Sequence, residues 1–313
     1  MTPQQLNQYI PQWMRQFDVK ATSIVIIENH TVMYRSGFGS FNHKQINSDT
    51  LMNAQSLTKP MVAFRALQIV EAGLLDLDLP LQNYLKKPYS PDKRVDKITT
   101  RHALSHATGL PNWRDQNTDL ILSFDAGTDY NYSGEGYCYL QTVMEVITGK
   151  PLEQLMQPLF EAVGMSDSFM ETFTEEMREH WFFKDFAHLN TNAAFSLMTT
   201  ADDYAKFMLT MLADDYQSIA DVMLSPEQGV AAKDGFYWGN GWGIEDTPKG
   251  RYFWQWGAGT DERHLAIGNQ ETGWATVIMT TDNEGTDNGL AFAHKITQQY
   301  DADLGKWFDW LSE

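Results

Sequence analysis

Residues 54–60 read AQSLTKP and stand directly before an apolar pattern that predicts a helix over residues 61–72. Pro60 falls in the first turn of this helix, where a missing N–H costs nothing. Ser56 is therefore expected at the helix N-terminus, with Lys59 on the same face, because residues three apart are neighbours on a helix. Since the helix dipole stabilises a developing alkoxide, Ser56 is a candidate nucleophile and Lys59 its activating group.

The Ser-x-x-Lys spacing is weak evidence by itself, because Ser90 and Lys93 match it as well. That second match lies in a polar loop punctuated by proline, with no apolar helix after it, and we interpret it as accidental. For Ser56 alone, a simple helix cap is as good an interpretation as a nucleophile. The surrounding sequence has to decide between them.

The composition is that of a globular protein, with 313 residues, 42% hydrophobic residues and a formal net charge of −18. This charge disfavours nucleic acid and anionic membranes as partners, because both are bound chiefly through clustered Lys and Arg. No apolar run approaches the roughly 18 residues of a membrane-spanning helix. The first residues lack the basic start and apolar run of a secretory signal, so we expect a cytoplasmic protein, although a signal trimmed earlier would leave no trace.

The predicted elements follow the order helix, two strands, a long helical segment, three strands and a final helix. They are expected at residues 3–17, 23–28, 31–35, 56–221, 251–256, 264–267, 274–281 and 289–311. We predict an α+β fold in which terminal helices flank an antiparallel sheet and a large, mostly helical subdomain is inserted into the sheet. The sheet subdomain takes residues 1–50 and 229–313, the helical subdomain takes residues 51–228, and the active site is expected in the cleft between them.

Further sequence blocks follow AQSLTKP in order. They read RHALSHATGLP at residues 101–111, YSG at 132–134, GKPL at 149–152 and FSLMTTADD at 195–203. Together with residues 51–78, these blocks resemble the class C β-lactamase and penicillin-binding-protein-like family of serine hydrolases, with its related esterases and D-alanyl carboxypeptidases. The resemblance covers about residues 22–285 and implies a β-lactamase/transpeptidase-like fold.

The resemblance also implies the other parts of an active site. Tyr132 would present its phenol oxygen to Ser56, and either Tyr132 or Lys59 would take the Ser56 proton. Residues 256–259 read WGAG and match the family's third motif, so the amides of Ser56 and Gly259 would form an oxyanion hole, an assignment that leaves room for a shift of one residue. The residues then expected to line the substrate are Gly134, Trp256, Gly257 and Ala258.

Trp256 and Gly134 depart from the family pattern, which has Lys or His and Asn at these two places. Both changes remove polar groups, while aromatic side chains crowd the neighbouring sequence at residues 236–238, 242 and 252–254. An apolar or aromatic acyl group therefore fits better than a penicillin. A compensating charge remains available from Arg251, Arg263 or His264.

These features predict a serine hydrolase that acts through an acyl-enzyme on a small ester or amide, esterase-like and with weak or no β-lactamase activity. A D-amino-acid peptidase and a β-lactamase are the alternatives within this class. A non-catalytic ligand-binding protein on the same scaffold is the alternative from another class. The joint presence of Ser56, Lys59 and Tyr132 favours an active enzyme.

No cofactor and no metal is expected. His102 and His106 have the i, i+4 spacing that suits a metal on one helix face, but no His-Glu-x-x-His string or obvious third ligand accompanies them. Gly-x-Ser-x-Gly, Gly-x-Gly-x-x-Gly and Walker strings are absent from the sequence as well. The expected partner is a small ester, amide or peptide substrate.

Overall fold

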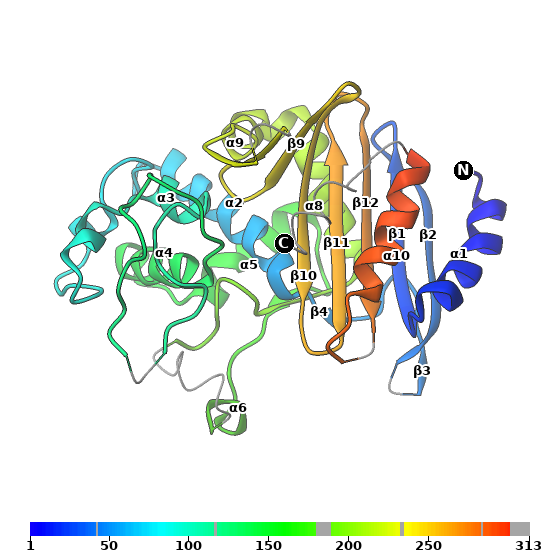
Figure 1. Ribbon diagram of the computed structural model, residues 1–313, viewed down its shortest axis with the longest axis horizontal. Coiled ribbons are helices and arrows are strands. Elements are labelled where there is room, and N and C mark those ends of the chain that lie inside the picture. The colour runs from blue at the N-terminus through cyan, green and yellow to red at the C-terminus, as the bar shows by residue number, and fades with distance from the viewer. Residues whose placement is uncertain (42, 116–117, 180–188, 232–234, 283, 301–313) are drawn as a thin grey trace.

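The structure is a computed structural model and describes residues 1–313 except 42, 116–117, 180–188, 232–234, 283 and 301–313. Within these residues one large antiparallel sheet has the strand order β3-β2-β1-β12-β11-β10-β9-β8-β7 (Figure 1). Its strands are β1 Ala21–Glu28, β2 Thr31–Phe41, β3 Lys44–Gln45, β7 Gln228–Ala231, β8 Phe236–Trp238, β9 Gly243–Thr247, β10 Gly250–Ala258, β11 Glu262–Asn269 and β12 Trp274–Thr281. The sheet thus joins strands from both ends of the chain, as the sequence predicts.

Strands β1 and β12 form an antiparallel pair in the interior of the sheet, in which Ile24 faces Ile278. Both strands are buried almost throughout, which explains their continuous apolar runs. The predicted hairpin of β1 and β2 is confirmed. Its two turn residues, Asn29 and His30, have φ of 50° and 60°, the left-handed geometry whose twist matches that of paired strands.

Two helices near the chain ends, α1 Pro3–Phe17 and α10 Asn288–Thr297, cover one face of the sheet (Figure 1). Helix α1 buries Leu6, Ile10 and Met14, spaced four residues apart, against the sheet. The final helix is shorter than predicted, because a 3₁₀ turn at Gln298–Tyr300 follows α10. The rest of its predicted range, residues 301–313, lies outside the described residues.

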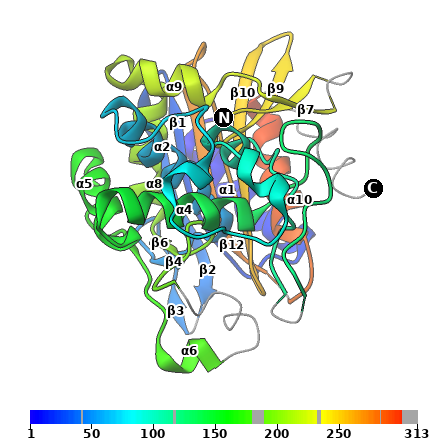
Figure 2. The ribbon, with the colours of Figure 1, turned by 90° about the vertical axis from the view of Figure 1, so that its left-hand side faces the viewer.

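The opposite face of the sheet carries the helical segment, seen in front of the sheet in Figure 2. Helix α8 packs directly on β1 and β12, and the remaining helices extend from it. The helices are α2 Thr58–Glu71, α3 Thr100–Leu104, α4 Gly134–Thr148, α5 Leu152–Val163, α6 Glu175–Glu179, α8 Ala201–Leu212 and α9 Gln217–Met223. Further 3₁₀ turns are η1 Gln55–Leu57, η2 Leu81–Tyr84, η3 Lys93–Lys97 and η4 Asp214–Tyr216, and a small second sheet contains β4 Met52–Asn53, β6 Leu197–Thr199 and β5 Phe169–Met170.

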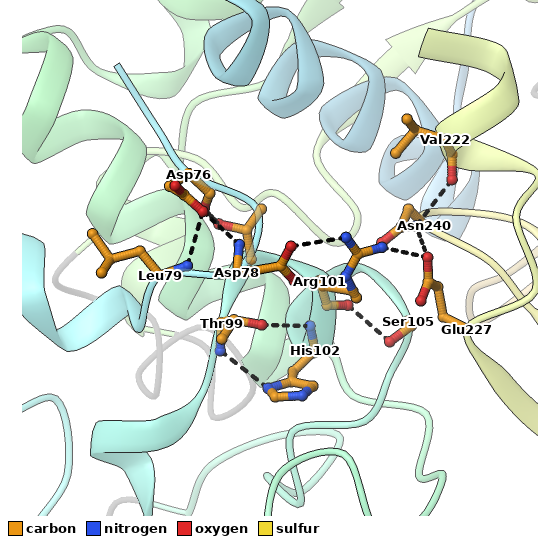
Figure 3. A network of polar contacts seen from close by, with 11 residues as sticks. Asp76, Asp78, Leu79, Thr99, Arg101, His102, Ser105, Val222, Glu227 and Asn240 are labelled. Carbon is orange, nitrogen blue, oxygen red and sulfur yellow. Dashed lines mark hydrogen bonds and ion pairs between the residues drawn. The ribbon is translucent and has the colours of Figure 1, made fainter. Parts of the chain in front are cut away.

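A polar network ties the helical segment to the far edge of the sheet (Figure 3). Arg101 of α3 donates to both carboxylate oxygens of Asp78, at 2.7 and 3.0 Å, and also forms an ion pair with Glu227. Asn240 donates to the same Glu227 carboxylate at 2.9 Å. Glu227 in turn donates its backbone N–H to Trp238 of β8 at 2.9 Å, so Arg101 links α3 to the β7–β8 edge.

Candidate active site

Ser56 lies in the 3₁₀ turn η1, which runs directly into helix α2. The preceding residue, Gln55, has φ of 51°, a left-handed conformation that is uncommon for a residue with a side chain. Asn53 and Thr58 hold this turn, since the Asn53 side chain accepts from the Gln55 N–H at 2.8 Å and Thr58 donates to the Gln55 carbonyl at 2.6 Å. The turn leaves Ser56 partly exposed at the start of the helix.

Lys59 lies one helical turn further on and is completely buried. Its Nζ is 2.9 Å from Ser56 Oγ and 3.0 Å from the carbonyl oxygen of Ala194. Burial lowers the pKa of Lys59 to about 7, with a smaller opposing effect from the Cys138 thiol. A neutral amine is therefore accessible near neutral pH, placed to accept a proton from Ser56.

Tyr132 completes the group around the serine. Lys59 Nζ lies 4.8 Å from the centre of the Tyr132 ring, and the Tyr132 hydroxyl accepts from Gln255 Nε2 at 3.0 Å. Burial raises the pKa of Tyr132, and the hydrogen bonds to Ser56 and Gln255 oppose this rise only in part. The structure therefore brings Ser56, Lys59 and Tyr132 together, with the phenol protonated at neutral pH.

His106 supports the segment that carries Tyr132. Its ring centre lies 4.2 Å from that of Tyr132, and its Nδ1 accepts from the Ser133 N–H at 3.0 Å. Burial holds the pKa of His106 well below its usual value, so the ring is neutral. Helix α3 ends at Leu104, which removes the i, i+4 geometry from His102 and His106, and the described residues contain no group of three possible metal ligands.

The end of strand β10 packs against the nucleophile turn. A Cβ on Gly257 would lie 2.6 Å from the Ala54 carbonyl oxygen, so only glycine allows this close approach. Side chains alternate along a strand, which places Gln255 on the same face as Gly257 and Trp256 on the other. Gln255, and not Trp256, therefore presents its polar side chain to the Tyr132 hydroxyl, while the Trp256 ring lies 4.9 Å from the Tyr132 ring.

The same register bears on the expected oxyanion hole. The Gly259 N–H donates to the Glu262 carbonyl at 3.0 Å and closes the β10–β11 turn, so this amide is already engaged. In the next pair, Ala258 with Arg263, the alternation of an antiparallel ladder turns the Ala258 N–H away from β11. Strand β9 pairs with β10 only as far as Trp254, which leaves this edge open. The Gly259 amide is therefore not available for an oxyanion hole, and the amide that points to the open edge is that of Ala258, one residue earlier.

A sequence model of the Beta-lactamase family matches residues 6–299. The chain belongs to the Beta-lactamase family. Among curated relatives, esterase EstB of Burkholderia gladioli is 26% identical over 196 residues, 52% of this chain and 50% of that protein. Penicillin-binding protein 4* of Bacillus subtilis is 23% identical over 171 residues, 47% of this chain and 37% of that protein. The chain spans about half the length, or less, of the curated relatives it matches.

Solved structures of other Beta-lactamase-fold proteins confirm the predicted fold. An octameric penicillin-binding protein homologue from Pyrococcus abyssi has a TM-score of 0.77 at 19% identity, covering 93% of this chain and 76% of that chain. A D-amino acid amidase from Ochrobactrum anthropi has a TM-score of 0.71 at 18% identity, covering 93% and 99%. None of the described helices is both long and apolar enough to cross a lipid bilayer.

The second departure from the Beta-lactamase family pattern, Gly134, opens helix α4, and its N–H donates to Asn112 Oδ1 at 2.9 Å. The indole of Trp113 occupies the space that a side chain at residue 134 would take. Neither Trp113 nor Gln255 was predicted from the sequence. Signals were present, since a glycine at a motif position indicates close packing, and Gln255 has the strand spacing to Gly257.

The three residues considered for a compensating charge are engaged elsewhere in the structure. Arg251 pairs with Asp246 at 2.7 Å and Arg263 pairs with Asp287 at 2.7 Å. Burial lowers the pKa of His264 to about 4, and its ring bridges the Asn53 carbonyl and the Thr280 N–H. The aromatic character of the site is therefore not offset by these groups.

Proposed function

We propose that the chain is a serine hydrolase that acts through an acyl-enzyme on a small ester or amide, esterase-like and with weak or no β-lactamase activity. The observation that carries this proposal is the 2.9 Å contact between Lys59 Nζ and the partly exposed Ser56 Oγ. A buried lysine with a pKa of about 7 is a competent base for a serine hydroxyl.

In the proposed first step the Lys59 amine accepts the Ser56 proton while Oγ bonds to the substrate carbonyl carbon. The amine can donate to the Ala194 carbonyl and still offer its lone pair to the serine. The amides of Ser56 and Ala258 hold the oxygen that becomes negative. Such preorganised donors typically contribute about 10²–10³-fold to the rate.

The proton then passes through Tyr132 to the leaving group. Tyr132 gives its hydroxyl proton to the departing oxygen or nitrogen as the bond to the carbonyl carbon breaks, and it regains a proton from Lys59. Gln255 steadies the phenol oxygen at 3.0 Å during this transfer. In the second half, water attacks the carbonyl carbon of the acyl-enzyme and gives a proton to Lys59 and Tyr132. The bond from that carbon to Ser56 Oγ then breaks, Oγ recovers a proton and the carboxylic acid leaves.

The surroundings support an apolar acyl group. Trp113 offers ring surface beside Lys59 and Ser56, while Arg251 and Arg263 are paired with carboxylates elsewhere. A free carboxylate on the substrate, as in a penicillin, would thus find little to bind.

The test is burst and steady-state release of p-nitrophenol from acetate and butanoate esters, with nitrocefin assayed beside them, for the wild type and Ser56→Ala. We expect ester turnover that disappears in the variant and little nitrocefin cleavage. Rapid nitrocefin cleavage would overturn the esterase assignment. Equal turnover by both proteins would overturn the role of Ser56, and no turnover of either substrate class would favour a binding protein.

A further inference from the structure

The indole of Trp113 lies beside the reacting atoms. Its ring centre is 5.9 Å from Lys59 Nζ, and Nζ is 2.9 Å from Ser56 Oγ. The side chain is only partly buried, so part of its ring can contact a bound molecule. A group attached to a carbonyl under attack by Ser56 can therefore contact this ring.

Trp113 and Gly134 compete for the same space, so a side chain at residue 134 and the indole of Trp113 cannot both fit. A Cβ built on Gly134 would lie 2.3 Å from Cζ3 and 2.4 Å from Cη2 of the Trp113 ring. Real atoms do not approach this closely, so any side chain at residue 134 would have to displace the indole. The glycine thus leaves room for the tryptophan, and the two residues form one steric unit.

The loop that carries Trp113 is held to the N-terminus of α4 on both sides of the indole. Asn112 accepts from the Gly134 N–H through its side chain and from the Glu135 N–H through its backbone carbonyl, each at 2.9 Å. Arg114 forms an ion pair with Glu135, which is completely buried. This attachment fixes the position of the indole, as a wall of a binding site requires.

Two further rings, both buried in the core, support the indole. Phe195 meets Trp113 edge-on with ring centres 5.6 Å apart, and Phe173 stacks on Phe195 at 6.0 Å. Phe195 directly follows Ala194, whose carbonyl oxygen binds Lys59 Nζ. The three rings therefore lie near Lys59, next to the segment whose carbonyl oxygen binds Lys59 Nζ.

A different group of aromatic rings surrounds Tyr132, the residue next to the leaving group in the proposed reaction. Tyr132, which gives the proton to the leaving group in the proposed reaction, packs against Trp256 at 4.9 Å and Trp238 at 5.6 Å. Trp113 packs instead on Phe195. In the proposed reaction the leaving group lies beside Tyr132 and the rings of Trp238 and Trp256, and the acyl group lies beside Trp113.

We infer that Trp113 determines acyl specificity, by closing the acyl side of the site with an apolar wall that accepts short aliphatic acyl groups and excludes long ones. This inference rests on the proposed hydrolase function. The substrate class it names is esters or amides of small, uncharged acyl groups.

The first test measures kcat/KM for p-nitrophenyl acetate, butanoate, hexanoate and octanoate with wild type, Trp113→Ala and Trp113→Phe. We expect the octanoate-to-butanoate ratio to rise about tenfold or more in Trp113→Ala and by less in Trp113→Phe, since one methylene in an apolar pocket changes kcat/KM by roughly 10–200-fold. Trp13→Ala is the matched control, because Trp13 stacks on Tyr9 in α1 across the sheet, and its ratio should stay at the wild-type value. Equal changes for all four esters in Trp113→Ala would overturn the inference.

The second test needs no activity. Gly134→Ala should lower Tm by about 2–6 °C in the wild type, from overpacking against the indole. In the Trp113→Ala background the same substitution should leave Tm unchanged or raise it, because Ala is the better helix residue. An equal Tm change in both backgrounds would overturn the claim that Trp113 and Gly134 share one space. Absence of ester turnover in the wild type would instead count against the proposed function, and the Tm comparison would still decide the steric claim.

Discussion

Lys59 Nζ lies 2.9 Å from Ser56 Oγ, although Lys59 itself has no solvent-exposed surface. Ser56, by contrast, is partly exposed. A substrate can therefore reach the nucleophile Ser56, while water cannot reach the base Lys59. No described carboxylate forms an ion pair with Lys59, so burial dominates its chemistry and lowers its pKa to about 7.

The pH dependence of ester hydrolysis should follow the titration of Lys59. Only the neutral amine can accept the Ser56 proton, so kcat/KM should rise with pH through an apparent pKa of about 7. The rate should then stay level through pH 9, because burial keeps the pKa of Tyr132 above its usual value. Ser56→Ala gives the background of uncatalysed hydrolysis. A rate that falls between pH 6 and 8 would contradict a neutral Lys59 as base.

Replacement of Lys59 by methionine should abolish turnover and yet stabilise the fold at mildly acidic pH. Below the folded pKa of about 7 the wild type carries a buried charge, and its penalty is relieved as pH rises from about 7 toward the reference value of 10.5. We expect the free energy of unfolding at pH 6 to exceed that of the wild type by roughly 1–3 kcal/mol. Urea unfolding at pH 6 and pH 9 gives the free energy of unfolding of both proteins. The difference between the variant and the wild type should be smaller at pH 9. A variant less stable than the wild type at pH 6 would refute this account.

Ala258→Pro tests the revised oxyanion hole, because proline lacks the N–H and is tolerated on an open strand edge. We expect kcat for ester hydrolysis to fall by about 10²–10³-fold with little change in Tm. Ala258→Gly keeps the N–H and should retain activity within a few-fold of the wild type. If Ala258→Pro keeps wild-type kcat, Ala258 does not supply the second amide.

Arg101→Ala should loosen the attachment of α3 to the β7–β8 edge. The substitution leaves the Glu227 carboxylate, only 17% exposed, without its cation. Because Arg101 is itself 30% exposed, we expect a moderate loss of about 1–2 kcal/mol in unfolding free energy. Arg251→Ala is a suitable comparison, since the Arg251–Asp246 pair is more exposed and should contribute less than about 1 kcal/mol. Equal losses in the two variants would argue against a special role for Arg101.

The parts of the site that could be predicted without the family resemblance are local in the sequence. Ser56 and Lys59 share one helical turn, and the helix that follows is marked by its apolar period and by Pro60. The β1–β2 hairpin is equally local, because Asn29 and His30 sit between two apolar runs. In both cases the sequence signal comes from residues that are neighbours along the chain.

Features that depend on contacts between residues far apart in the sequence could not be predicted in the same way. A slip of one residue in β10 exchanges the faces of Gln255 and Trp256, and only the pairing with β9 and β11 selects between them. Trp113 reaches the site because its loop folds onto α4, with Gly134 giving it space. No local pattern in residues 112–114 indicates that contact.

The most direct test of the central claim is covalent labelling with a fluorophosphonate, followed by peptide mapping by mass spectrometry. The wild type should carry one adduct, on Ser56, and Ser56→Ala should carry none. Ser90→Ala removes the other serine with the Ser-x-x-Lys spacing and should label like the wild type. Labelling that persists in Ser56→Ala, or an adduct on any other residue, would contradict the assignment of Ser56 as the nucleophile.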